Sequence, residues 1–433
     1  MNKQERPLYL FLWIILGAWA AAGFFAEGFI STLSGLLDLQ FQPARLIADF
    51  SEAAGEGAAL LNSAFVAAIG LFLIRINRVR LSGPTVAAVF TMLGFGLFGK
   101  TPVNCIPVIL GVFISAKIMK KSFREYILIA LFGTALGPLV TMLFAELGVM
   151  IGGGIPLAAA GGITAGIFLP PLALTMLRFH QGFNLYNIGM TSGFFAVFAA
   201  AVITAAKGKT TGEILWTAEP SLLFVLLIPV LSVVLIAAGI VFGKRGVFKG
   251  FFGIMKLPGR LPSDFMDSVS PGSALLNMGV LGILFWLYVM IIGGDLNGPV
   301  LGGILTIIGF AAFGKHPKNV LPLAAGIAAA ILIFGKDFTA PGPLLAFLFG
   351  TTLAPIAGEF GPVAGFIGGF LHLAMVERTG AWHLGINLYN NGFAGGLTAT
   401  FIVSVIEWWR NNRGERPKKQ AAVKEEPEVE ETV

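Results

Sequence analysis

Long charge-free apolar stretches, separated by short segments that hold the charges, make up most of the chain. A helix that crosses a bilayer needs about 20 consecutive apolar residues. The pattern therefore predicts an all-α polytopic membrane protein. Ten stretches qualify as crossings, at 7–26, 57–74, 126–145, 147–177, 181–206, 220–243, 268–294, 338–358, 360–376 and 379–406.

Two further apolar segments, 81–116 and 296–332, are each broken by a Gly-Lys-x-Pro turn. Each fragment is short for a crossing. Irregular backbone at membrane depth is tolerated only where protein or a water-filled cavity covers it. We therefore predict two re-entrant hairpins, and full crossings by all fragments, fourteen in total, are the alternative.

The chain is an internal duplication, since adding 215 to many first-half positions reaches an equivalent residue. Phe-Gly-Lys-x-Pro-x-Asn occurs at 98–104 and 313–319, and Gly-x-Asn-Leu-Tyr-Asn at 182–187 and 385–390. The predicted organisation is a first repeat over 1–210, a second over 211–411 and a charged, disordered cytoplasmic tail over 412–433.

Loop charges indicate that the two repeats are inverted. Residues 27–56 hold five acidic side chains and one arginine, whereas the equivalent residues 242–271 hold five basic side chains and two aspartates. Cytoplasmic loops collect Lys and Arg, so these two loops are predicted on opposite sides. Both basic termini then lie in the cytoplasm, and the expected location is the cell (inner) membrane.

Composition narrows the function classes. Charged residues make up 12% of the chain and hydrophobic residues 56%, against about 25% charged in soluble domains, which excludes a water-soluble enzyme. The single cysteine excludes a disulfide framework, and the scattered basic residues do not indicate nucleic acid. No catalytic or nucleotide-binding motif is present, so we expect neither an enzyme nor a cofactor nor a bound metal. The expected partners are the lipid bilayer and a small polar solute, and a homo-oligomer is left open.

The Gly-Lys-x-Pro-x-Asn turns are the first candidate site. Thr101 before Pro102 resembles a helix N-cap, and a helix start attracts anions through its N–H groups and dipole. We therefore predict that the turns bind solute through Lys100, Asn104, Lys315 and Asn319. The alternative is that the lysines extend to the membrane surface or form structural pairs.

The Gly-x-Asn-Leu-Tyr-Asn motifs are the second candidate, because they place amides and a phenol at the start of the last span of each repeat. The predicted path-lining residues are Asn184, Tyr186, Asn187, Asn387, Tyr389 and Asn390. Glu146, Glu359, His180 and His383 are the candidates for coupling to H⁺ or Na⁺. Interhelical hydrogen bonding is the alternative for the amides, and a surface position is the alternative for the glutamates.

These doubled motifs resemble a two-copy bacterial membrane-protein family catalogued as a domain of unknown function. A weaker likeness links Gly182 to Asn187 and Gly385 to Asn390 with urea transporters. That likeness implies two inverted five-helix halves with short re-entrant helices. It concerns architecture only.

Inverted repeats with broken helices near the midplane are typical of transporters. The leading hypothesis is a transporter or facilitator of a small polar, anionic solute, with a midplane site at the repeat interface. One alternative is a passive channel for a neutral, urea-like or amide-like solute. Another is a membrane scaffold or enzyme subunit without transport.

Overall fold

The computed structural model describes residues 5–147, 153–206 and 214–412, with the side chains of 146 and 147 left out. These ranges are helical throughout, apart from loops and two isolated bridges. Nine helices within them are long and apolar enough to cross a membrane. The predicted all-α polytopic membrane protein is thereby confirmed.

The two repeats contain similar successions of helices, which differ in their short helical turns. The first has α1 (Arg6–Glu27), α2 (Phe29–Leu39), α3 (Phe50–Ala54), α4 (Glu56–Ile76), α5 (Gly83–Phe95), α6 (Pro102–Ile118), η1 (Phe123–Tyr126), α7 (Ile127–Gly133), η2 (Thr134–Leu136), α8 (Gly137–Met142), η3 (Leu143–Leu147), α10 (Gly154–His180) and α11 (Asn187–Ala205). The second has α12 (Leu222–Gly243), η4 (Lys244–Gly246), α13 (Val247–Ile254), α14 (Phe265–Ser268), α15 (Pro271–Ile292), α16 (Gly298–Phe310), α17 (Pro317–Ile333), α18 (Pro341–Phe349), η5 (Gly350–Leu353), α19 (Ala354–Phe360), α20 (Pro362–Trp382) and α21 (Asn390–Asn412).

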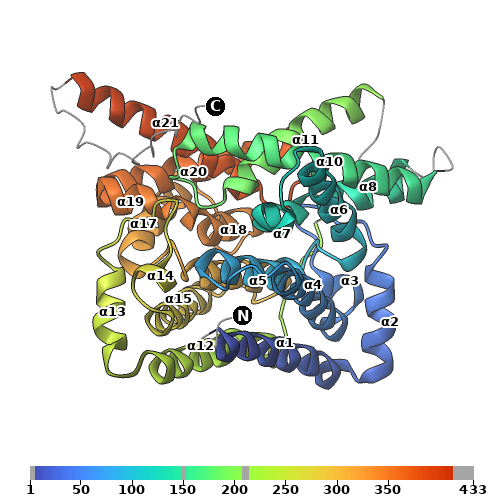
Figure 1. The fold of residues 1–433 in the computed structure, drawn as a ribbon, viewed down its shortest axis with the longest axis horizontal. Coiled ribbons are helices and arrows are strands. Elements are labelled where there is room, and N and C mark those ends of the chain that lie inside the picture. Colours follow the sequence, from blue (N-terminus) through green and yellow to red (C-terminus); the bar gives the residue numbers. More distant parts are fainter. Residues whose placement is uncertain (1–4, 148–152, 207–213, 413–433) are drawn as a thin grey trace, which may run out of the picture.

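The two repeats are arranged about an approximate twofold axis, which is vertical in Figure 1. The equivalent helices α2 and α13 lie at the right and left edges, and α6 and α17 lie on opposite sides in the same way. At the centre, α5 packs against α16. A side chain on Gly94 would meet the carbonyl oxygen of Gly302 at 2.7 Å, so small residues allow this close approach.

Loop contacts divide the connections into two groups, which we call the basic side and the acidic side. On the basic side, Gly83 N donates to Asp264 at 3.1 Å, and Arg260 Nε donates to the Gln181 carbonyl at 2.8 Å. On the acidic side, Asp49 N donates to the Leu215 carbonyl at 3.1 Å, and Ser221 N donates to Glu56 at 3.0 Å. The equivalent loops 27–56 and 242–271 thus lie in different groups, which agrees with inverted repeats.

Some predicted span boundaries are wrong, because the last helix of each repeat begins later than expected. α11 begins at Asn187 rather than 181, since Gln181 and Gly182 have positive φ values of 50° and 81°. The predicted span 360–376 falls on α20 (Pro362–Trp382), which is not among the nine apolar helices. Residues predicted to open the final span at 379 instead end α20 at Trp382, and α21 begins at Asn390.

The Gly-Lys-x-Pro turns connect α5 to α6 and α16 to α17. Thr101 accepts a hydrogen bond from Asn104 N at 3.2 Å, which confirms the predicted helix start at Pro102. In the second repeat His316 takes the same capping position before Pro317. Residues 97–101 at the first turn are all buried, as are 312–316 at the second.

Candidate functional site

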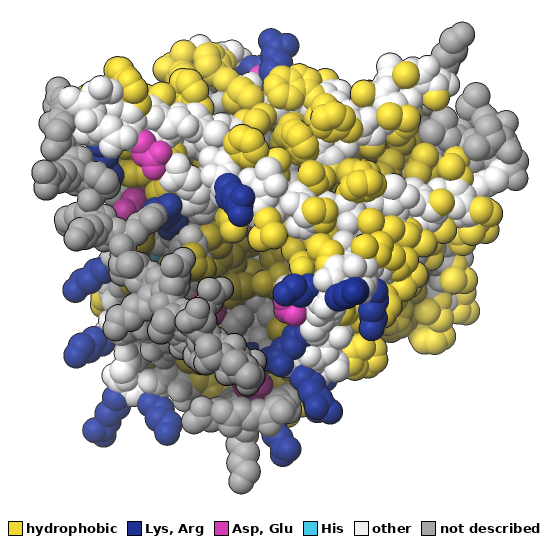
Figure 2. All heavy atoms as spheres, turned by 45° about the horizontal axis from the view of Figure 1, so that its top comes forward, with side chains coloured by type: hydrophobic (Ala, Val, Ile, Leu, Met, Phe, Trp, Pro, Cys, Tyr) yellow, Lys and Arg dark blue, Asp and Glu magenta, His cyan; other side chains and the backbone are white. Residues whose placement is uncertain are grey.

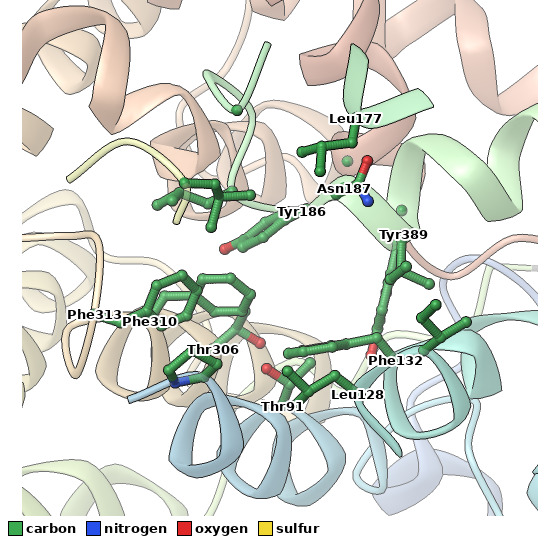
Figure 3. A pocket seen from close by; sticks show the side chains of 18 of the residues that line it. Thr91, Leu128, Phe132, Leu177, Tyr186, Asn187, Thr306, Phe310, Phe313 and Tyr389 are labelled. Carbon is green, nitrogen blue, oxygen red and sulfur yellow. The ribbon is translucent and has the colours of Figure 1, made fainter. Parts of the chain in front are cut away.

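A cavity of about 560 Å³ lies between the two repeats. Its walls come from α5, α7, α11 and the loop before it, from α16, and from residues 388–392 (Figure 3). One end reaches the basic side at Pro84, Gly182 and Pro262. Figure 2 shows Lys and Arg side chains gathered around a hollow with hydrophobic side chains inside. Among the described residues, the acidic-side loop before α21 contributes only Leu388 and Tyr389 to the wall.

Aromatic side chains from both repeats form part of the cavity wall, and four threonine and tyrosine hydroxyl groups lie among them. Phenylalanines from both repeats contribute, namely Phe95, Phe132, Phe310, Phe313 and Phe349. The hydroxyls belong to two equivalent pairs, Thr91 with Thr306 and Tyr186 with Tyr389, which surround the space in Figure 3. Thr306 donates to its own helix, whereas Thr91 Oγ1 is buried without a hydrogen-bond partner in the described structure. The wall can therefore surround an apolar body and bind one polar group.

Directly behind the cavity, each tyrosine bonds a lysine from the other repeat. Lys100 Nζ donates to the Tyr389 hydroxyl at 2.6 Å, and Lys315 Nζ donates to the Tyr186 hydroxyl at 2.6 Å. Lys315 also donates to Thr351 Oγ1 at 2.8 Å. Both lysine side chains are fully buried. Two crossed Lys–Tyr pairs thus join the repeats at the site.

The charge of these lysines has no carboxylate to balance it. In the ranges that the structure describes, no Asp or Glu oxygen lies within 4.0 Å of either ammonium group. Lys100 instead lies over the rings of Phe95 and Tyr389, at 5.4 and 4.7 Å from their centroids. Burying an unpaired ammonium group is costly, so an anion nearby would be favoured.

Asparagines one helix away fix the position of each lysine. Asn62 Nδ2 donates to the carbonyls of Gly96 and Lys100 at 2.7 and 2.8 Å. Asn277 Nδ2 donates to the carbonyls of Ala311 and Lys315 at 2.8 and 2.7 Å. These bonds hold the backbone of both turns in place. They therefore fix the points from which the lysine side chains extend.

The predicted turn residues lie near the cavity but do not line it. Lys100 and Lys315 are separated from it by the tyrosines, and neither they nor Asn104 and Asn319 contribute to its wall. Asn104 Oδ1 accepts from Thr101 N and its Nδ2 donates to Gly99 O, both at 2.9 Å. Its side chain thus closes the turn on itself. The N–H groups expected to receive an anion are in part occupied by these caps.

Some residues of the Gly-x-Asn-Leu-Tyr-Asn motifs line the cavity, and others hold the loops that carry them. Tyr186, Asn187 and Tyr389 line the cavity. Asn184 and Asn387 instead donate across the interface, to Gly392 O at 2.9 Å and Gly189 O at 3.4 Å. They position the loops on which the tyrosines lie.

The remaining predicted residues lie away from the cavity wall or outside the description. His180 bonds Asn187 at 2.9 Å, and His383 bonds Asn390 at 3.0 Å, so each histidine secures its own motif. Glu359 is exposed near the end of α19. The side chain of Glu146 lies outside the described residues. Among the described residues, no three His, Cys, Asp or Glu side chains form a possible metal site.

Sequence reasoning did not single out Thr91 and Thr306, although a signal was present. They are related by the same offset of 215 as the glycines that follow them, Gly94 and Gly309. A hydroxyl group at equivalent positions of two otherwise apolar segments could have indicated a polar contact inside the membrane.

The comparisons place the chain among known families. A family model described as "Protein of unknown function (DUF1576)" matches residues 30–205 and again residues 243–408. The chain belongs to this family. One match falls in each half of the chain, which confirms the expected resemblance to a two-copy family. No match to the chain was found among the curated proteins or among the solved structures.

Proposed function

We propose that the protein is a secondary transporter or facilitator for a small organic anion, which binds in the cavity between the inverted repeats. The observation that supports this most is the cavity itself, since residues of both repeats surround it and, among the described residues, its wall extends to the basic-side loops at Pro84, Gly182 and Pro262. Inverted-repeat transporters bind their solute at the repeat interface and expose it to alternate sides. The family assignment adds no activity.

The chemistry of the wall supports an anion that has an apolar part. Two buried ammonium groups lie behind the tyrosines without a carboxylate partner in the described structure. The Tyr389 oxygen accepts from Lys100, and the described residues offer no acceptor for its own proton. A solute carboxylate would provide that acceptor and would also bind the unpartnered Thr91 hydroxyl. The phenylalanines would cover the apolar remainder of the solute.

The opening on the basic side corresponds to an inward-facing state. On the acidic side, Leu215 and Trp216 bond residues of both repeats. Leu215 exchanges backbone hydrogen bonds with residues 47 and 49, and Trp216 Nε1 donates to Asp295 at 2.8 Å. The buried hairpin turns support the re-entrant interpretation, since neither turn reaches solvent. In this proposal Glu146 and Glu359 remain candidates for coupling to an ion.

The location that we propose is the cell inner membrane with both termini in the cytoplasm, which gives a labelling prediction. The native Cys105 is fully buried, so it provides a silent background. In intact cells a membrane-impermeant maleimide should label Asp38→Cys in α2, and it should label Lys249→Cys in α13 only after permeabilisation. Labelling of both variants in intact cells would contradict the inverted arrangement.

The experiment that tests the proposed function is a thermal-stability screen followed by uptake into proteoliposomes. Small carboxylates such as benzoate and hexanoate should stabilise the purified protein, and inorganic anions should do so less. A ligand at a hundred times its Kd adds about 2.7 kcal/mol. The Thr91→Val/Thr306→Val variant should lose this stabilisation, because it removes two hydroxyls and preserves side-chain shape.

A neutral channel is the second candidate, and the hydroxyl-lined wall is the observation that favours it. Stabilisation by urea or amides alone, with uptake unchanged when Lys100 and Lys315 are both replaced by methionine, would support that candidate against the anion. A screen without any stabilising ligand, joined to an absence of uptake, would contradict transport and favour a scaffold.

A further inference from the structure

A second recess, of about 250 Å³, lies at the basic side and away from the central cavity. Four arginines line it, together with one carboxylate, one phenol and two apolar side chains: Arg75, Arg78, Arg80, Arg124, Glu5, Tyr9, Val79 and Leu81. We call this set the arginine recess. It shares no lining residue with the central cavity.

The arginines reach the recess from separate parts of the fold. Arg75 lies in the last turn of α4, Arg78 and Arg80 lie in the loop that follows, and Arg124 lies in η1 after α6. Arg78 has a positive φ of 54°, a conformation that non-glycine residues seldom adopt. The preference for basic cytoplasmic loops explains the sign of these residues, but it does not require them to converge on one hollow.

Three of the four guanidinium groups are available to a ligand. Arg80 pairs with Asp267 of the second repeat. In the described part of the chain, no carboxylate lies within ion-pair distance of Arg75, Arg78 or Arg124. Guanidinium groups form paired hydrogen bonds with phosphate oxygens, so three of them around one hollow favour a phosphate group.

The recess belongs to one repeat only. The positions equivalent to Arg75, Arg78 and Arg80 are Met290, Gly293 and Asp295, which lie on the acidic side. A feature of the duplicated solute path would be expected in both repeats. The arginine recess is therefore not part of the duplicated pattern.

Exposed apolar side chains lie on the helix that carries Arg75 and at the end of the helix that precedes Arg124. Phe72 and Ile76 on α4 are each 54% exposed, and Ile118 at the end of α6 is 66% exposed. Such side chains on membrane helices contact acyl chains. A ligand that joins a phosphate to acyl chains would contact both surfaces together.

We propose that the arginine recess binds the headgroup phosphate of an anionic phospholipid of the cytoplasmic leaflet. Arg75, Arg78 and Arg124 bind the phosphate oxygens, and the carboxylate of Glu5 accepts a hydrogen bond from a headgroup hydroxyl. The acyl chains lie along α4 and α6. Basic pockets between membrane helices are known to bind headgroups of this class.

The test compares two triple variants of the full-length protein in detergent. Arg75→Gln/Arg78→Gln/Arg124→Gln removes the free arginines of the recess. Lys244→Gln/Arg245→Gln/Lys249→Gln removes the same charge from η4 and α13 on the same side. Each is titrated with dioleoyl phosphatidylglycerol, with dioleoyl phosphatidylcholine and with glycerol 3-phosphate, and thermal stability is measured.

Phosphatidylglycerol should stabilise the parent protein and the Lys244 triple variant, and its apparent affinity should fall at least tenfold in the Arg75 triple variant. An Arg→Lys triple variant at the same three positions should show an intermediate loss, and it covers the case in which the glutamine variant does not fold. Equal losses in both glutamine variants would mean diffuse attraction to the basic side and would overturn the site. Stabilisation by glycerol 3-phosphate as strong as that by the lipid would overturn the lipid as ligand.

Discussion

Replacing both buried lysines with methionine, as Lys100→Met/Lys315→Met, is expected to abolish uptake and to leave the protein at least as stable as the parent. Each ammonium group is fully buried and bonds only hydroxyls among the described residues. Exchanging buried charges for apolar side chains of similar size is often neutral or stabilising. In this variant, however, the two positive charges that attract the anion are absent. We expect uptake of the carboxylate found in the stability screen to fall by at least tenfold, which corresponds to about 1.4 kcal/mol.

The matched control for this variant is Lys117→Met/Lys120→Met, which removes two exposed lysines from the end of α6 and the turn after it. Its uptake and its melting temperature should both remain near those of the parent. If the buried-lysine variant instead melts well below the parent and retains uptake per folded molecule, the lysines are structural. The anion hypothesis would then be wrong, while the central cavity could still conduct a neutral solute.

Inserting a large side chain where paired helices meet at glycine should prevent folding. A Cβ atom at Gly111 of α6 would overlap the Ile163 carbonyl of α10, and one at Gly326 of α17 would overlap the Phe366 carbonyl of α20. Backbone cannot move aside as a flexible side chain can. Overpacking costs about 1–3 kcal/mol and more where backbone must shift. Gly326→Leu should therefore remove most of the monodisperse protein on size-exclusion chromatography, and Gly111→Leu should do the same.

Gly17→Leu is the control for these two variants. Gly17 lies in the middle of α1, and a Cβ atom there would have no neighbour within 4 Å. Its yield and its melting temperature should match the parent. Normal yields of Gly326→Leu would show that α17 and α20 are less closely packed than the structure indicates.

Features that depend on neighbouring residues were predictable from the sequence. The cap at Thr101 needs only the residue types that follow it, and the duplication needs only self-comparison. The start of α11 was misplaced, because Gln181 is a non-glycine residue with positive φ and nothing in its neighbourhood predicts that conformation. The positions of the apolar stretches also do not predict which faces of two helices pack against each other.

The arrangement of the candidate site depended on contacts across the chain. Both lysines and both tyrosines were candidates, yet their pairing joins residues 289 and 129 positions apart. The comparison of repeats relates Lys100 to Lys315 and, after small gaps, Tyr186 to Tyr389, so it does not reveal that the pairs cross between the repeats. Whether these residues bind solute stays a prediction.

The crossed pairs have a consequence for biogenesis. The first repeat is synthesised first, and at that stage Lys100 and Tyr186 lack the partners that bond them across the interface, because Tyr389 and Lys315 belong to the second repeat. Until residue 389 is inserted, the Lys100 amino group has the Phe95 ring of its own repeat but lacks its hydrogen-bond acceptor. The site is completed only when almost the whole chain has left the ribosome.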